Sequence, residues 1–124
     1  MKPKEMNVLA LAYLGDSIYE NYIRLHLLKS GISKVNDLQK KAVNYVSARA
    51  QSEYLTKLIN QEIFNEEEIS IIMRARNHKS KSKPKNTDIL TYKYATALEA
   101  VIGYLYLENK IEKLDKIMNL IIGE

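Results

Sequence analysis

Two acidic residues, Asp16 and Glu99, each occupy an apolar stretch of the sequence and have small residues nearby. Gly15 directly precedes Asp16, and Gly103 follows Glu99 by four positions, which places it on the same face of a helix. A glycine inside a helix costs about 1 kcal/mol relative to alanine, and a buried carboxylate must be paired, hydrogen-bonded or bound to a metal. The pattern therefore predicts two helices that approach closely and bring the two carboxylates to one point.

Two carboxylates at one point could bind a hard divalent cation. Mg²⁺ prefers oxygen ligands and is often held by one or two carboxylates together with a substrate phosphate. Such a cation supplies an activated water and offsets phosphate charge, as phosphodiester hydrolysis requires. On the residues alone, two roles for Asp16 and Glu99 agree with the sequence equally well. They could be Mg²⁺ ligands, or they could be buried acids that pair with a basic or hydroxyl group. Glu20, one turn after Asp16, is a candidate third ligand, but we favour an ion pair between Glu20 and Arg24.

Length and composition restrict the class of protein. The chain has 124 residues, enough for the core of one domain, and 46% of them are hydrophobic. The sequence contains no cysteine, which excludes disulfides and thiolate zinc sites. No apolar run reaches the roughly 18 residues that a membrane span needs, and the first residues show no secretory pattern. We therefore predict a cytoplasmic protein without a membrane partner.

The positive charge is concentrated in one segment, residues 74–93. This segment holds seven basic residues and one acid, a net charge of +6, whereas the rest of the chain has a net charge of −2. Such a concentration is typical of proteins that bind phosphate backbones, although a solvated charged loop is the alternative. The candidate residues for binding a nucleic acid are Arg74, Arg76, Asn77, His78, Lys79, Lys81, Lys83, Lys85, Asn86 and Thr87.

Hydrophobic periodicity predicts an all-α protein with five to seven helices, since no long run alternates with period two. Whether residues 35–60 form one helix or two stays open, with Ser33 or Asn36 as the first cap and Ser47 as a candidate restart. Asn65 is expected to cap a further helix, and Thr87 or Asp88 the next one. The helices are predicted at residues 5–29, 35–60, 66–77, 88–108 and 111–122.

Two motifs resemble the catalytic domain of the ribonuclease III family. LAYLGDSIYE is similar to the family's helix built around Leu-Gly-Asp, and ALEAVIGYLYLE is similar to its later Glu-Ala-Leu-Ile-Gly helix. QKKAVNYVSARAQ, EEEISIIMRARNHKS and PKNTDILTYKYATALEA resemble the Mini-III ribonucleases, a subfamily that lacks the double-stranded RNA-binding domain. The resemblance covers nearly the whole chain, so we expect one catalytic domain over residues 1–124.

The chain departs from the wider family at three acidic positions. Glutamates are expected where this sequence has Leu9 and Ala12, and an aspartate is expected at Thr96. Asp16 and Glu99 are the acids that the resemblance retains, which matches the Mini-III pattern. The resemblance thus implies that Asp16 and Glu99 are catalytic residues and Mg²⁺ ligands.

The resemblance also implies an activity and partners. It predicts an Mg²⁺-dependent endoribonuclease that cleaves double-stranded RNA, matures the large-subunit (23S) ribosomal RNA precursor, and has a ribosomal protein as a candidate helper. It predicts a homodimer with Tyr13 at the interface. The alternative is a non-catalytic helical module that binds double-stranded RNA or the ribosome.

Overall fold

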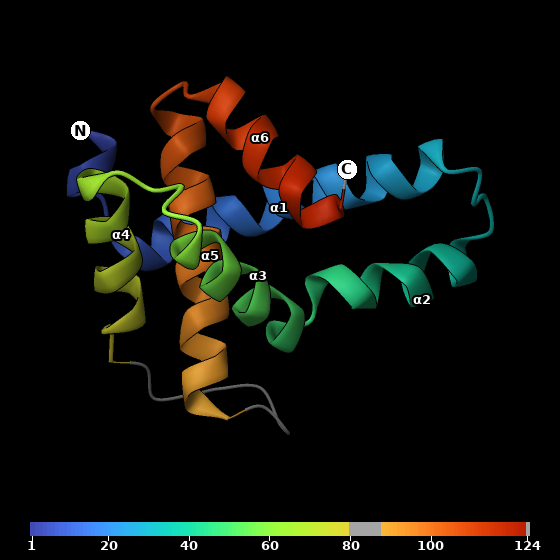
Figure 1. Ribbon diagram of the computed structural model, residues 1–124, viewed down its shortest axis with the longest axis horizontal. Coiled ribbons are helices and arrows are strands. Elements are labelled where there is room, and N and C mark those ends of the chain that lie inside the picture. Colours follow the sequence, from blue (N-terminus) through green and yellow to red (C-terminus); the bar gives the residue numbers. More distant parts are fainter. Residues whose placement is uncertain (80–87, 124) are drawn as a thin grey trace.

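The computed structural model describes residues 1–79 and 88–123, and within these ranges the chain forms helices and no strands (Figure 1). The predicted all-α fold is therefore confirmed. None of the helices in the described part is long and apolar enough to cross a membrane. The elements are η1 (Pro3–Glu5), α1 (Val8–Lys29), α2 (Val35–Val46), α3 (Ala48–Asn60), α4 (Glu66–Arg76), α5 (Ile89–Leu107) and α6 (Ile111–Ile122).

Helix α5 forms the centre of the fold. Residues 95–105 of this helix are buried at every position except Glu99, which is partly exposed. α1, α3 and α4 pack against α5 (Figure 1), and α1 makes the most extensive contact with it. An apolar helix of this kind is stable in water because its neighbours cover it. Within residues 95–105, Glu99 is the position that this covering leaves partly open.

The prediction of a single helix from residue 5 to residue 29 was wrong at its start. Pro3–Glu5 forms a separate 3-10 turn, and α1 begins at Val8. The side chain of Asn7 accepts a hydrogen bond from the backbone N–H of Leu9, at 2.8 Å, and so caps the helix. Asn7 thus starts α1 separately from the turn, which Met6 ends.

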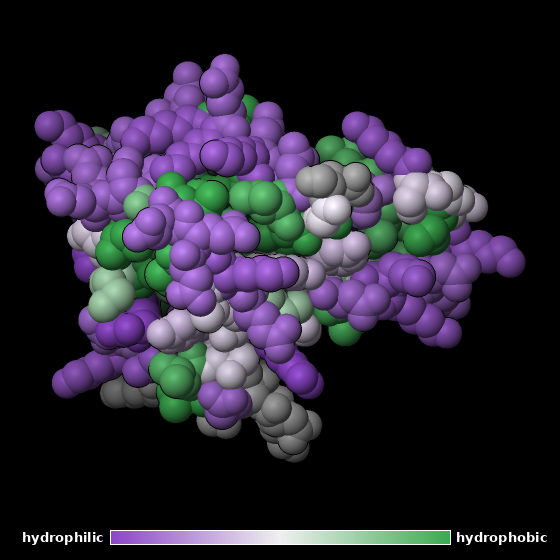
Figure 2. Space-filling model, viewed as in Figure 1, coloured by the Kyte–Doolittle hydropathy of each residue, from purple (hydrophilic) through white to green (hydrophobic). Residues whose placement is uncertain are grey.

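Helix α1 has an exposed face, although residues 9–14 are all apolar or aromatic. Leu9 is 40% exposed and Tyr13 is 85% exposed. Figure 2 likewise shows apolar areas that reach the surface between hydrophilic ones. One face of α1 packs on α5 through Val8, Leu11 and Ala12, while the other faces solvent in the single chain.

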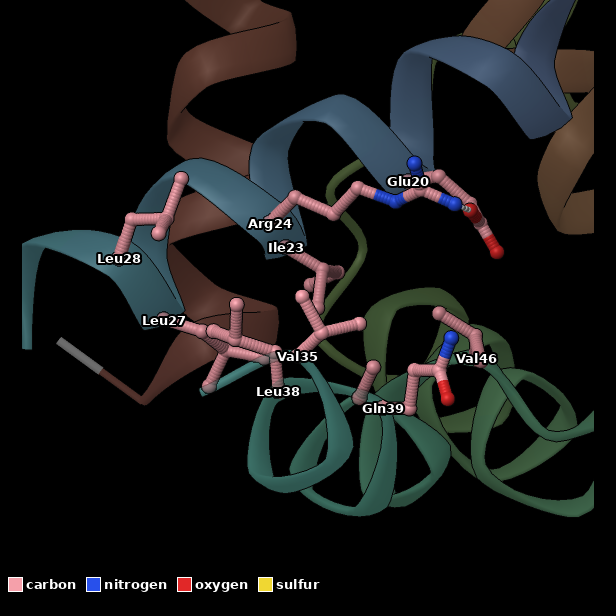
Figure 3. Close-up of a pocket in the computed structure, with 10 residues that line it drawn as sticks. Glu20, Ile23, Arg24, Leu27, Leu28, Val35, Leu38, Gln39 and Val46 are labelled. Atoms are coloured by element: carbon pink, nitrogen blue, oxygen red, sulfur yellow. Dashed lines mark hydrogen bonds and ion pairs between the residues drawn. The ribbon is translucent and has the colours of Figure 1, made fainter. Parts of the chain in front are cut away.

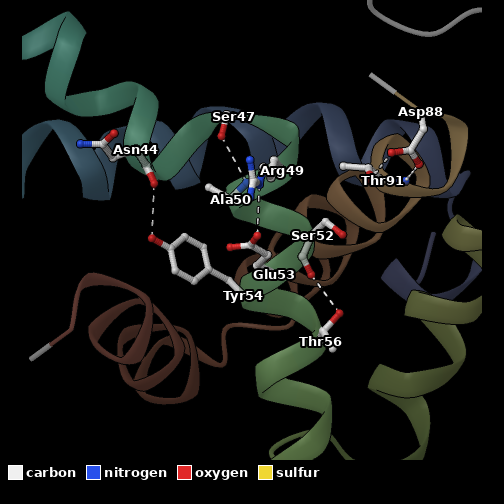
Figure 4. Close-up of polar contacts among 10 residues, drawn as sticks. All are labelled: Asn44, Ser47, Arg49, Ala50, Ser52, Glu53, Tyr54, Thr56, Asp88 and Thr91. Carbon is white, nitrogen blue, oxygen red and sulfur yellow. Dashed lines mark hydrogen bonds and ion pairs between the residues drawn. The ribbon is translucent and has the colours of Figure 1, made fainter. Parts of the chain in front are cut away.

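Residues 35–60 form two helices that are separated by Ser47. The backbone of Ser47 is extended, with φ −63° and ψ 152°, so it ends α2 and caps α3 at once. Its side chain accepts a hydrogen bond from the backbone N–H of Ala50 (Figure 4), at 3.2 Å. The predicted restart at Ser47 is confirmed. The start of α2 differs, because Lys34 precedes it without a side-chain cap.

The predicted helix caps after α3 are found where the structure describes them. Asn65 and Glu68 form a reciprocal capping box at the start of α4. Asp88 caps α5 by accepting from the backbone N–H of Thr91 (Figure 4), at 2.9 Å, whereas Thr87 lies outside the described residues. The last helix has the predicted bounds.

Candidate active site

The crossing of α1 and α5 depends on two glycines that bring the backbones into direct contact. A Cβ atom added to Gly15 would lie 1.7 Å from the carbonyl oxygen of Glu99. One added to Gly103 would lie 2.1 Å from the carbonyl oxygen of Leu11. Both distances are far below any possible carbon–oxygen contact, so only glycine permits this approach. The close crossing predicted from the glycines is therefore present.

Asp16 and Glu99 lie on either side of this crossing and interact with each other. Burial, then hydrogen bonding to Asp16 and the charge of Asp16, together raise the pKa of Glu99 to about 8, and the hydrogen bond from Gln51 opposes this shift. Asp16 itself is exposed, so the expectation of a buried aspartate was wrong. The more buried member of the pair is Glu99. One carboxyl group thus faces solvent, and the other lies behind it against the core.

Gln51 of α3 approaches the pair from a third helix. The side-chain Nε2 of Gln51 donates a hydrogen bond to Oε2 of Glu99 at 3.5 Å, and Gln51 is 3% exposed. The sequence reasoning did not select this residue. A signal was present, since Gln51 lies on the same face of its helix as Leu55 and Leu58, both buried. The side-chain amide of a polar residue on such a buried face needs a hydrogen-bond partner.

Tyr19 connects α1 to the end of α2, close to the start of α3. Its side chain is fully buried, and its hydroxyl donates to the carbonyl oxygen of Tyr45 at 2.6 Å. Tyr45 lies two residues before Ser47, the junction of α2 and α3. Burial raises the pKa of the Tyr19 hydroxyl well above its ordinary value, and the charge of Glu99 is among the lesser causes. Tyr19 therefore stays a neutral hydrogen-bond donor beside the acids.

Glu20 and Arg24 form the ion pair that the sequence favoured. Arg24 Nη2 lies 2.6 Å from Glu20 Oε2 (Figure 3). Both residues border a small surface depression that also contains Asp16. On their other side they meet an apolar groove between α1 and α2. Glu20 thus lies near the acids with its charge balanced by arginine.

The donor set fits a hard cation such as Mg²⁺. Two carboxyl groups that share a hydrogen bond, one of them with a pKa near 8, repel each other when both are ionised, and a divalent cation relieves that repulsion. In residues 1–79 and 88–123 no group of three or more histidine, cysteine, aspartate or glutamate residues could hold a metal ion. Two carboxylates are nevertheless sufficient for an ion that keeps most of its waters.

Half of the predicted RNA-binding residues lie in the part of the chain that the structure describes, and the other half lie outside it. Arg74 donates to the carbonyl oxygens of Lys4 and Met6, at 2.7 and 3.0 Å, and so holds the N-terminal segment against α4. Arg76 donates to the side chain of Asn77 at 3.3 Å, at the end of α4. His78 is partly exposed and Lys79 is exposed. Lys81, Lys83, Lys85, Asn86 and Thr87 lie outside the described residues.

Comparisons with known proteins match this arrangement of helices and motifs. A model of the ribonuclease III domain matches residues 9–110. Mini-ribonuclease 3 of Staphylococcus aureus is 45% identical over 119 residues, covering 96% of this chain and 89% of that protein. Mini-ribonuclease 3 of Clostridium tetani is 47% identical over 121 residues, covering 97% and 79%.

A solved structure shows the same fold. The crystal structure of protein FN1578 from Fusobacterium nucleatum is similar to this chain with a TM-score of 0.85 and 40% identity, over 95% of this chain and 93% of that one. The domain match covers most of the sequence, and the relatives are similar over nearly their full length. The chain therefore belongs to the ribonuclease III family and is an endoribonuclease.

Proposed function

We propose that the chain cleaves double-stranded RNA in an Mg²⁺-dependent reaction, with Asp16 and Glu99 as the residues that hold the ion. The observation that carries this proposal is the crossing of α1 and α5. Gly15 and Gly103 bring the two backbones into contact, and the carboxyl groups of Asp16 and Glu99 meet beside that contact. A site of this kind fits the endoribonuclease activity of the family.

The two acids have different tasks in this proposal. Asp16 is exposed and meets substrate and solvent directly. Glu99 is held behind it and must release its proton, because its pKa is near 8 and a ligand to a cation must be ionised. A divalent cation held between them would activate a water and offset the phosphate charge. The protein contributes a fixed spacing of the acids and a partly buried environment that strengthens their charge interactions.

The basic segment supplies the affinity for RNA in this proposal. Its lysines suit phosphates as mobile point charges, and polar side chains such as Asn77 suit the sugar hydroxyls that distinguish RNA from DNA. Arg74 is engaged with backbone carbonyls. The contact of Arg74 with RNA stays a prediction that requires these bonds to be exchanged for bonds to phosphate.

A cleavage assay tests the proposal. Duplex RNA is incubated with the wild type and with Asp16→Asn, with and without Mg²⁺. We expect cleavage that requires Mg²⁺ and falls more than about a hundredfold in the variant, because an amide cannot replace a charged ligand. Asp37→Asn, which changes an exposed acid of α2, is the control and should cleave normally. Normal cleavage by Asp16→Asn would exclude this site.

The alternative drawn from the sequence, a non-catalytic module that binds RNA, conflicts with the family to which the chain belongs. Its one support is the small number of acids, since the site has two carboxylates where the wider family pattern has more. This candidate predicts RNA binding that depends on salt but no cleavage at any Mg²⁺ concentration.

We further propose a cytoplasmic homodimer that acts on the precursor of large-subunit ribosomal RNA. Support for the dimer comes from α1, where Tyr13 is 85% exposed and Leu9 is 40% exposed beside the site. Exposed aromatic side chains of this size are typical of protein interfaces. Analysis of ribosomal RNA ends in cells that lack the protein tests the substrate. Adding large-subunit ribosomal proteins to the cleavage assay tests the helper.

A further inference from the structure

We propose that Gln51 is a positioning residue of the candidate cation site, which holds the Glu99 carboxylate in the orientation that accepts the ion. This inference rests on the proposed function, since it assumes that Glu99 is a ligand. Gln51 lies in α3, 48 positions before Glu99 in the sequence. It is outside the two motifs that contain Asp16 and Glu99, and it ends the stretch QKKAVNYVSARAQ.

The contact is specific to one oxygen of Glu99. Gln51 Nε2 points to Oε2 at 3.5 Å, and among the described residues no other side chain donates a hydrogen bond to this carboxyl group. An amide donor binds a charged carboxylate more strongly than a neutral one. Hydrogen bonds in sites without their ligands are often long and shorten when the ligand binds. We therefore expect this contact to tighten when the cation ionises Glu99.

The burial of Gln51 argues against a role in surface solvation. The residue is 3% exposed and lies beside Leu55 and Leu58 on the buried face of α3. A buried amide costs free energy unless it is hydrogen-bonded, and an apolar residue at this position would pack without that cost. A contact with Glu99 explains why the amide is retained on this face.

The surroundings fix Gln51 in place. Ser47 starts α3 one turn before Gln51 and caps it through Ala50 (Figure 4). The hydroxyl of Tyr19 is bonded to Tyr45 at the end of α2 and so anchors the junction to α1, the helix that carries Asp16. α1 is thus joined to the end of α2 by a partly buried hydrogen bond, and α3, which carries Gln51 to Glu99, begins directly after this end. Residues that orient metal ligands typically need such support.

Binding of Mn²⁺ to the full chain without RNA tests the inference. Mn²⁺ replaces Mg²⁺ because free Mn²⁺ is measured directly by electron paramagnetic resonance. Gln51→Met keeps the volume and removes the donor. We expect about tenfold weaker Mn²⁺ binding, as for other residues that orient metal ligands. Gln61→Met, at the exposed end of α3, is the matched control and should bind as the wild type does. Unchanged binding by Gln51→Met would overturn the inference.

A double-mutant cycle separates positioning from direct coordination. Glu99→Asp withdraws the carboxylate from Gln51 but leaves an acid on α5. If Gln51 acts through Glu99, adding Gln51→Met to this background changes binding less than about twofold. A second tenfold loss in this background would show that the amide contacts the ion itself and would overturn the positioning role.

A second variant and the binding of metal by the wild type separate failure of the cation site from failure of the role of Gln51. Gln51→Leu, which continues the leucine face of α3, repeats the measurement if Gln51→Met does not fold by circular dichroism. If the wild type binds neither Mn²⁺ nor Mg²⁺, the cation site of the proposed function fails. If the wild type binds and both Gln51 variants bind equally well, only the inference on Gln51 fails.

Discussion

Gly15 lies directly against the carbonyl oxygen of Glu99, so that the residue preceding one acid contacts the backbone of the other acid. An added Cβ would lie 1.7 Å from that oxygen. The distance between the two helices that carry the acids is therefore set by backbone contact and not by the packing of side chains. This relationship connects the stability of the fold with the geometry of the candidate site.

Substituting Gly15 with alanine should damage both properties. Forcing a methyl group into a packed contact typically costs about 1–3 kcal/mol, and this contact involves a rigid carbonyl group. We expect a loss of stability at or above the upper end of that range, measured by urea unfolding, and weaker Mn²⁺ binding. Ala10→Leu enlarges an exposed position of the same helix and serves as control. Wild-type stability of Gly15→Ala would contradict the close crossing.

The raised pKa of Glu99 predicts how stability depends on pH. Burial and Asp16 raise this pKa from 4.5 to about 8. Between these values the folded metal-free protein holds a proton that the unfolded chain has lost. The contribution of Glu99 to stability is therefore full below about pH 4.5 and is lost as the pH rises through about 8. Unfolding of the wild type and of Glu99→Gln across this range measures it, and parallel curves would contradict the assignment.

The same pKa predicts that cation binding releases a proton. Below about pH 8 the ion must displace the proton from Glu99, so binding weakens as the pH falls. Calorimetric titration with Mg²⁺ in two buffers of different ionisation enthalpy measures the number of protons released. We expect release near pH 7 from the wild type and none from Glu99→Gln. Equal release from both proteins would place the proton on another group.

Neutralising the lysines of the basic segment should reduce the salt dependence of RNA binding. The variant changes Lys79, Lys81, Lys83 and Lys85 to glutamine. Each phosphate contact contributes roughly one unit to the slope of log affinity against log salt, so we expect the slope to fall by up to about four. A control variant carries the same change at Lys2, Lys4, Lys57 and Lys116, and an equal effect in both would show a general charge effect.

Tyr13→Ala should weaken the proposed dimer. A large aromatic side chain at the centre of an interface often contributes about 2 kcal/mol or more, which corresponds to a change in Kd of roughly thirtyfold. Sedimentation equilibrium measures this change. Leu120→Ala removes an apolar side chain that is 41% exposed on α6 and is the control. A monomeric wild type would exclude the dimer, and an unchanged Kd would exclude Tyr13.

The sequence predicted those elements whose signals are local. α6 has the expected bounds because its apolar positions repeat regularly, and Asn65 caps α4 because its partner Glu68 is only three residues away. The predicted start of α1 was wrong. The residue pattern is compatible with a helix that starts at residue 5 and with one that starts after Asn7, and it does not distinguish the two. The glycines beside the two acids indicated the crossing correctly.

The parts of the site that the sequence did not predict depend on distant contacts. The role of Gln51 is set by a helix 48 positions away, and the hydroxyl of Tyr19 reaches a carbonyl group 26 positions away. The division into exposed Asp16 and partly buried Glu99 follows from how deeply each helix lies in the fold, since residues 95–105 of α5 are almost entirely buried and α1 has an exposed face. Helical periodicity contains no information on that difference.

Arg74 is attached to the main chain of Lys4 and Met6, and both of its acceptors are carbonyl oxygens. Because every amino acid offers this same group, substitutions at these two positions leave the attachment intact, whereas deleting the segment would free the guanidinium at the foot of the basic segment. Trimming the chain would thus change the charge that RNA meets, even though every residue of the basic segment itself was unaltered.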